Sequence, residues 1–139
     1  MKFKVPFSAG SLDKLRKRAG YFKRYIKYKK DSVFKGTTTP DQTLKAGIGN
    51  CVDKSLLSKA MLDAIHIPNR LVLKYNSKEP EAHIFNQIVY NGQWTDFDTS
   101  CNTCTIGRTF SNNWETIAVI SNKDTFIFNR KIYKELMEA

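Results

Sequence analysis

The order of apolar and polar positions divides the chain into a helical first part and a strand-rich second part. Residues 11–28 repeat apolar side chains at every third or fourth position, with lysine and arginine between them. This spacing predicts an amphipathic helix with a basic outer face. Residues 37–42 predict a loop that leads into a short helical turn, with Thr39 as the N-cap before Pro40.

A second long helix is predicted over residues 51–65. Pro68 follows it closely, and proline cannot continue the backbone hydrogen bonds of a helix. The apolar positions form a stripe wide enough for a helix that is buried on more than one side. They are Val52, Leu56, Leu57, Ala60, Met61, Ala64 and Ile65.

The second half of the chain predicts an antiparallel sheet. Its segments are rich in β-branched and aromatic residues, and Asn91-Gly92 lies between two of them. This pair favours a type I′ turn, which places Tyr90 opposite Gln93 in a hairpin. The predicted strands cover residues 70–75, 82–90, 93–99, 116–121 and 125–129, and a last helix covers 130–139.

Helices followed by an antiparallel sheet indicate the α+β class. A length of 139 residues fits one domain, residues 1–139, which we expect to be monomeric. The chain contains no apolar run of the roughly 20 residues that a membrane helix needs. Its first residues, MKFKVPFSAG, also lack the apolar core of a signal peptide.

The net charge of +10 comes from the first quarter of the chain. Residues 1–36 hold twelve basic and two acidic residues, whereas residues 37–139 hold eleven of each. Such a segment favours a polyanion, a negatively charged cell envelope or an acidic partner. It is equally typical of a helix face that simply contacts water.

Three cysteines are too few for a disulfide scaffold, and their odd number leaves at least one free thiol. Cys101 and Cys104 form a CxxC pair, which is found in zinc sites and redox sites. A structural zinc site needs four ligands, and besides this pair the chain has only one cysteine and two scattered histidines. We therefore expect no metal here.

Cys51 follows a sequence that favours a helix start. Gly47 and Gly49 permit a tight turn, and Asn50 is a good N-cap. The first turn of a helix favours a thiolate, and its N–H groups, that of Cys51 included, can hold an oxyanion. The alternative is that Cys51 is a small buried apolar residue, as many free cysteines are.

A thiolate nucleophile needs a base, and the chain has two histidines. His66 lies about 22 Å from Cys51 along the same helix, which is too far. His83 begins a strand that a packed sheet could bring close to Cys51. In the Asn91-Gly92 hairpin, Asp98 becomes a diagonal neighbour of His83, while Asp96 lies further along.

The stretches GIGNCVDKSLLSKAMLDAIHIPNRLVL and HIFNQIVYNGQWTDFDTS resemble the transglutaminase-like branch of the papain-type cysteine enzymes, over about residues 40–100. The resemblance implies Cys51 as nucleophile, His83 as general base and acid, and Asp98 as the carboxylate that orients the histidine. Two positions depart from the family pattern. His66 replaces a glycine, and Phe85 stands where many members have tryptophan.

The same resemblance implies acyl transfer through a thioester. Hydrolysis is the simpler outcome, and a protein transglutaminase is the alternative. Tyr28 is similar to a tyrosine that some members carry upstream of the cysteine and is a candidate oxyanion donor, although a tyrosine there is equally typical of core packing. The substrate-binding candidates are Asn50, Phe85 and Trp94. The resemblance implies no cofactor, and it leaves open whether the activity depends on calcium.

A narrower resemblance rests on two segments, NCVDKSLL and DTSCNTCTIGRTFSNNWE. Both are similar to the catalytic domains of pseudomurein endoisopeptidases from viruses of methanogenic archaea. This implies a peptide or cell-wall peptide substrate and an action on the wall. A different class, a basic module that binds nucleic acid through the first helix, stays open. No nucleic-acid fold signature accompanies that helix.

Overall fold

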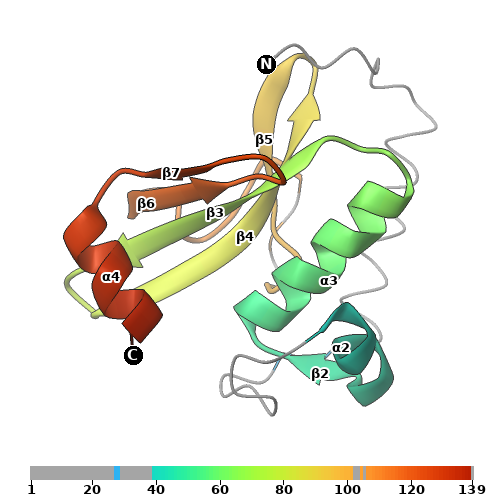
Figure 1. Ribbon diagram of the computed structural model, residues 1–139, viewed down its shortest axis with the longest axis horizontal. Coiled ribbons are helices and arrows are strands. Elements are labelled where there is room, and N and C mark those ends of the chain that lie inside the picture. Colours follow the sequence, from blue (N-terminus) through green and yellow to red (C-terminus); the bar gives the residue numbers. More distant parts are fainter. Residues whose placement is uncertain (1–26, 29–38, 102–103, 105, 139) are drawn as a thin grey trace.

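The computed structural model describes residues 27–28, 39–101, 104 and 106–138. Two short strands pair in parallel, and five strands form an antiparallel sheet in the order β5-β4-β3-β6-β7 (Figure 1). The α+β prediction is confirmed. The elements are β1 Lys27–Tyr28, α2 Pro40–Ala46, β2 Ile48–Gly49, α3 Cys51–Ala64, β3 Asn69–Asn76, β4 Glu81–Tyr90, β5 Gln93–Phe97, β6 Glu115–Ile120, β7 Thr125–Ile127 and α4 Arg130–Glu138.

The hairpin between β4 and β5 has the predicted register. Asn91 and Gly92 have φ angles of 51° and 77°, and Tyr90 pairs with Gln93. The pairing ends at Phe97, two residues earlier than predicted. Asp98 instead accepts a hydrogen bond from the backbone N–H of Ser100 at 2.9 Å, a local turn that competes with strand pairing.

The N-terminus of α3 forms as predicted. Asn50 caps the helix by accepting from the N–H of Asp53 at 3.1 Å, and Asp53 accepts from the N–H of Asn50 at 3.1 Å. Gly49 is required beside this capping box, because a Cβ atom there would lie 2.8 Å from the Cβ of Asp53. The first residue of the helix is therefore Cys51, held by a rigid cap.

The predicted burial of α3 is wrong in part. Val52 is 40% exposed and Ala64 is exposed, whereas the buried face is largely polar. Some polar groups there have partners, as when the side-chain amide of Asn86 in β4 donates to the carbonyl of Ser55 at 3.0 Å, whereas the hydroxyl of Ser58 has none among the described residues. The buried residues of α3 are Asp53, Lys54, Ser55, Leu57, Ser58 and Leu62.

His66, which stands where the resemblance predicts glycine, lies at the C-terminus of α3. His66 has a φ of 58°, in the left-handed region. Its N–H donates to the carbonyl of Asp63 at 3.0 Å, and the N–H of Ile67 donates to that of Leu62 at 2.9 Å. These two bonds form a Schellman motif, in which glycine is the favoured residue at the position of His66.

Helices α3 and α4 pack on one face of the sheet, at different ends (Figure 1). Ile88 of β4 packs with Leu62 of α3, and Ile84 of the same strand belongs to the cluster that contains Ile132 of α4. Side chains alternate along a strand, so His83 lies on the opposite face from Ile84.

The predicted helix over residues 11–28 lies outside the described residues except for Lys27–Tyr28. These two form β1, which pairs with β2, so the helix prediction is wrong at its end. The later strand pair and the last helix are confirmed as β6, β7 and α4.

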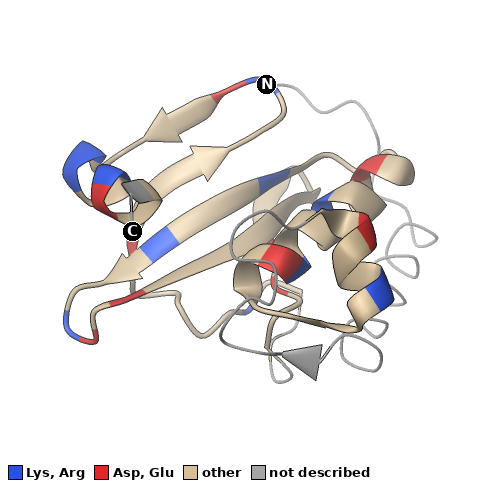
Figure 2. Cartoon of the chain, turned by 60° about the horizontal axis from the view of Figure 1, so that its bottom comes forward, with Lys and Arg blue, Asp and Glu red and all other residues tan. Residues whose placement is uncertain are grey.

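Figure 2 shows both signs of charge on α3 and α4. None of the described helices has the length and apolar character of a membrane span.

Candidate active site

Cys51 and His83 meet at an open edge of the sheet. Because β5 ends at Phe97, opposite Asn86, no described strand pairs with β4 on that side at His83. The thiol of Cys51 and the imidazole of His83 are hydrogen-bonded. Both line a cavity of about 250 Å³, together with Glu81, Ala82, Ser100 and Phe110.

Asp98 holds the other side of the imidazole. Its Oδ2 lies 2.7 Å from Nε2 of His83 and accepts from the hydroxyl of Thr109 at 2.6 Å. Its Oδ1 accepts from the N–H and the hydroxyl of Ser100, at 2.9 and 2.7 Å. Since Nε2 is bonded to the carboxylate, Nδ1 is the nitrogen that remains for the thiol of Cys51.

The electrostatics favour a charged His83. Burial works against the imidazolium, but hydrogen bonds to Asp98 and Cys51 and their negative charges raise the pKa of His83 to about 9. Burial also opposes ionisation of Asp98. The hydrogen bond and charge of His83, with the bonds from Ser100 and Thr109, nevertheless hold the Asp98 pKa below its ordinary value. At neutral pH a cation therefore lies between the Asp98 carboxylate and Cys51.

A second cation faces the same carboxylate. Lys54 is only 2% exposed and lies three residues after Cys51, hence on the same side of α3. Burial lowers the pKa of Lys54, and the negative charge of Asp98 acts in the opposite direction. Sequence reasoning missed this residue, because a lysine in an amphipathic helix is expected to face water.

Aromatic rings cover His83. Phe85 stacks on it with ring centres 5.4 Å apart, and Phe110 lies at 4.4 Å and contacts Trp114 edge-on. Phe85 is only 1% exposed and is absent from the lining of the Cys51 cavity, so its role in substrate binding stays a prediction. Phe110, which is 54% exposed and lines the cavity, has the position expected for that role.

Three other candidates are absent from the lining of the Cys51 cavity or are only partly described. Asn50 acts as the helix cap and is absent from the cavity lining. Trp94 lies beneath the guanidinium of Arg70, at 4.0 Å, and lines a different cavity. The backbone of Tyr28 pairs with Gly49, two residues before Cys51, while its side chain lies outside the description.

The CxxC pair lies beside the carboxylate. Cys104 is buried, and its sulfur is 3.9 Å from Oδ2 of Asp98. Burial, a hydrogen bond to Cys101 and the nearby negative charge of Asp98 raise the pKa of Cys104 to about 12. Among the described residues, no three His, Cys, Asp or Glu side chains form a group that could hold a metal ion.

Comparison with known proteins gives a family and a fold. Residues 6–99 match the model of the transglutaminase-like superfamily. A candidate cysteine protease from Cytophaga hutchinsonii has a similar structure, with a TM-score of 0.64 and 21% identity over 84% of this chain. The chain spans 37% of the length of that protein. A search of curated proteins gave no match.

LapG from Legionella pneumophila is also similar in structure. Its calcium-bound form has a TM-score of 0.66 and 15% identity over 97% of this chain and 81% of its own. Another structure of LapG gives a TM-score of 0.65, at 15% identity and with 97% and 79% coverage. At these identities the likeness concerns the fold.

Proposed function

We infer the function from the family, since the chain belongs to the transglutaminase-like superfamily. We propose that the protein is a cysteine hydrolase, which cuts peptide or isopeptide bonds through a thioester. Its catalytic residues are Cys51, His83 and Asp98, within a single catalytic unit of residues 1–139. The observation that carries the proposal is that one imidazole bonds both the thiol at a helix start and a buried carboxylate.

The first half of the reaction forms the thioester. The Cys51 thiolate attacks the carbonyl carbon, and the electron pair of the C=O bond moves to the oxygen. The N–H of Cys51 lies in the first turn of α3, where backbone N–H groups lack helical acceptors, and it stabilises this oxyanion. The C–N bond then breaks, and His83 donates its proton to the leaving amine.

The second half restores the enzyme. Water attacks the thioester carbon and gives a proton to His83, and the C–S bond breaks to release the acid and the thiolate. Asp98 keeps the imidazole in one orientation through both steps. Tyr28 is a candidate second oxyanion donor, since β1 places its backbone beside Gly49.

The narrower substrate that we propose is the lysine-linked isopeptide bond of pseudomurein. It is supported by the resemblance of NCVDKSLL and DTSCNTCTIGRTFSNNWE to the enzymes of methanogen viruses. The basic residues 1–36 would then attract the protein to a negatively charged wall. Calcium binds through several oxygen ligands. Calcium dependence stays a prediction, and among the described residues no three His, Cys, Asp or Glu side chains form a group that could hold a metal ion.

The test is incubation with methanogen wall preparations and with peptides that contain an ε-linked lysine, following released amines. Wild type should release amines and Cys51→Ser should not. Turnover of glutamine donors only in the presence of an added amine would replace the hydrolase with a transglutaminase. Equal activity of Cys51→Ser and wild type, with binding of DNA that weakens steeply with salt, would favour the nucleic-acid module.

A further inference from the structure

A second cavity lies at the other end of the sheet from His83. It encloses about 480 Å³, within the range of ligand sites, and shares no lining residue with the Cys51 cavity. The start of β3, the start of β5 and the turn between β6 and β7 line it. In the β3–β4 register, Arg70 at this cavity pairs with Gln87, whereas His83 pairs with Lys74.

Arg70 is held in a fixed orientation in this cavity. Its Nε donates to the side-chain oxygen of Gln87 at 2.9 Å, and the amide nitrogen of Gln87 donates to Asp96 at 2.9 Å. The guanidinium carbon lies 4.0 Å from the centre of the Trp94 ring. A stacked and bonded guanidinium loses little freedom when it binds a ligand.

The other end of this guanidinium is available. Within the described part of the chain, Arg70 makes no ion pair with a carboxylate, and its two terminal nitrogens have no hydrogen-bond partner. Burial lowers the pKa of Arg70, which indicates that its charge is partly removed from water. Two parallel N–H groups in one plane match the two oxygens of a carboxylate.

The remaining charges of the cavity do not cancel Arg70. Asp63 already pairs with Lys59 at 3.2 Å and accepts from Asn69 at 2.8 Å. Lys123 and Asp124 are neighbours on the exposed turn and carry opposite charges. An apolar wall comes from the ring of Phe126, which is 63% exposed.

We propose that this cavity binds the carboxylate of a peptide, with the terminal nitrogens of Arg70 holding the carboxylate and Phe126 contacting the adjoining side chain. The carboxylate follows from the chemistry of Arg70, whereas the choice of a peptide rests on the proposed function. The site would hold an acidic group of the substrate or product at a distance from the cleaved bond.

The experiment uses Cys51→Ala protein, so that no probe is consumed. The probes are acetyl-Leu-Ala, its C-terminal amide, and acetyl-Glu-Ala amide. The two tryptophan indole N–H signals in NMR spectra report on the two cavities, because Trp94 lines the second cavity and Trp114 contacts Phe110 at the first. Trp114→Phe assigns the signals. Acetyl-Leu-Ala carries a C-terminal carboxylate and acetyl-Glu-Ala amide carries a side-chain carboxylate, so these two probes show which kind of carboxylate the cavity binds.

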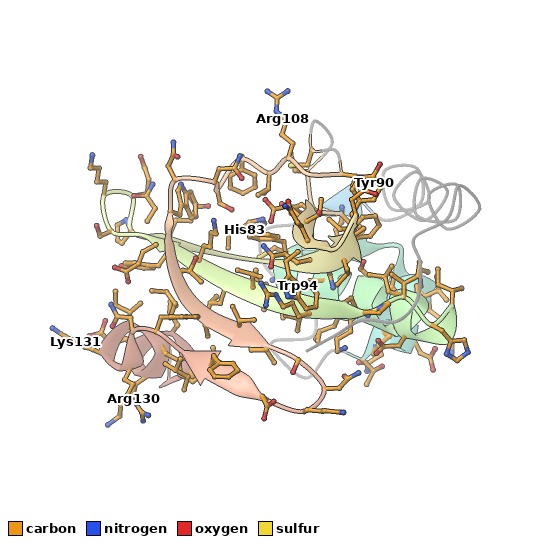
Figure 3. The ribbon with its side chains drawn as sticks, turned by 90° about the horizontal axis from the view of Figure 1, so that it is seen from above. His83, Tyr90, Trp94, Arg108, Arg130 and Lys131 are labelled. Atoms are coloured by element: carbon orange, nitrogen blue, oxygen red, sulfur yellow. The ribbon has the colours of Figure 1, made fainter. Side chains whose placement is uncertain are left out.

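We expect a saturable shift of the Trp94 signal with a carboxylate probe and none with the amide of acetyl-Leu-Ala. Arg70→Gln should weaken this binding about tenfold or more, and Arg70→Lys should weaken it less, because it keeps the charge and loses the planar fork. The matched control is Arg108→Gln, an exposed arginine that points away from the protein (Figure 3).

Three results would overturn the proposal. They are an equal shift with the amide, unchanged affinity in folded Arg70→Gln, and a shift of the Trp114 signal alone. All three can be read in a protein without a reactive thiol. Failure here is therefore distinguishable from failure of the hydrolase assay, which depends on Cys51.

Discussion

Thr109 donates its hydroxyl hydrogen, at 2.6 Å, to the oxygen of Asp98 that also bonds His83. Thr109 is 3% exposed. It lies in the loop between β5 and β6, eleven residues after Asp98. The carboxylate is thus positioned by a residue that belongs to neither the hairpin nor the helix. The consequence can be measured.

Thr109→Val should destabilise the protein by about 2 kcal/mol, because it removes a hydrogen bond to a buried charged group at nearly constant volume. The same change should lower the rate of amine release, since Asp98 then holds His83 less firmly. Urea unfolding and the hydrolase assay measure the two effects. Thr95→Val is the matched control, because it removes an exposed hydroxyl that bonds only the Gln93 carbonyl. Equal losses in both variants would contradict the prediction.

The raised pKa of His83 predicts a loss of stability in alkali. The ordinary pKa is 6.5 and the folded value is about 9. The stabilisation is therefore fully present below pH 6.5 and is lost as pH rises through about 9. The shift corresponds to a stabilisation on the order of 3 kcal/mol.

Urea unfolding of wild type and His83→Gln across this pH range should show the difference. The two free energies of unfolding should differ most near pH 6 and approach one another above pH 9. An NMR titration of the His83 ring gives an independent measurement. A midpoint below 7 would contradict the assignment of an imidazolium at neutral pH.

Lys54→Met should slow the alkylation of Cys51 by iodoacetamide at neutral pH by about tenfold, because the thiolate loses the attraction of a buried positive charge one turn away. Lys54→Arg should preserve part of the rate. Lys59→Met is the control from the same helix, since Lys59 pairs with Asp63 at the protein surface. If both methionine variants react like wild type, the buried lysine has only a packing role.

His66→Gly should raise the free energy of unfolding by about 1 kcal/mol, because glycine adopts the left-handed backbone at this position without a Cβ clash. Cys51 should react with iodoacetamide at the wild-type rate, since His66 lies at the far end of α3. Thermal or urea unfolding gives the measurement. His66→Ala separates the backbone effect from the loss of the imidazole, and an equal gain in that variant would contradict the explanation.

The contact between His83 and Asp98 was predictable because it depends on local rules. Asn91-Gly92 sets the hairpin register as far as Asn86 and Phe97, and Asp98 follows directly after this last pair, within reach of His83. Asn50 likewise predicted where α3 begins. Both features depend on backbone preferences over a few residues, which sequence patterns report directly.

Phe110, Thr109 and Lys54 could not be predicted in the same way. The first two reach His83 and Asp98 through the path of a long loop, and no local pattern specifies that path. Lys54 is buried because α3 carries its polar face toward the sheet, against the rule that an apolar stripe marks the core. Phe85 was assigned to the cavity wall because it stands where many members of the family have tryptophan, and that resemblance does not report how deeply this ring is buried.

Oδ1 of Asp98 accepts two hydrogen bonds from Ser100, and Oδ2 accepts hydrogen bonds from His83, Thr109 and the thiol of Cys104. A carboxylate so fully surrounded by donors is a poor proton acceptor, and the imidazole ring of His83 that it holds cannot rotate. Every proton that enters or leaves His83 during a reaction must then travel through Nδ1. Bond cleavage and the later attack of water would share a single route.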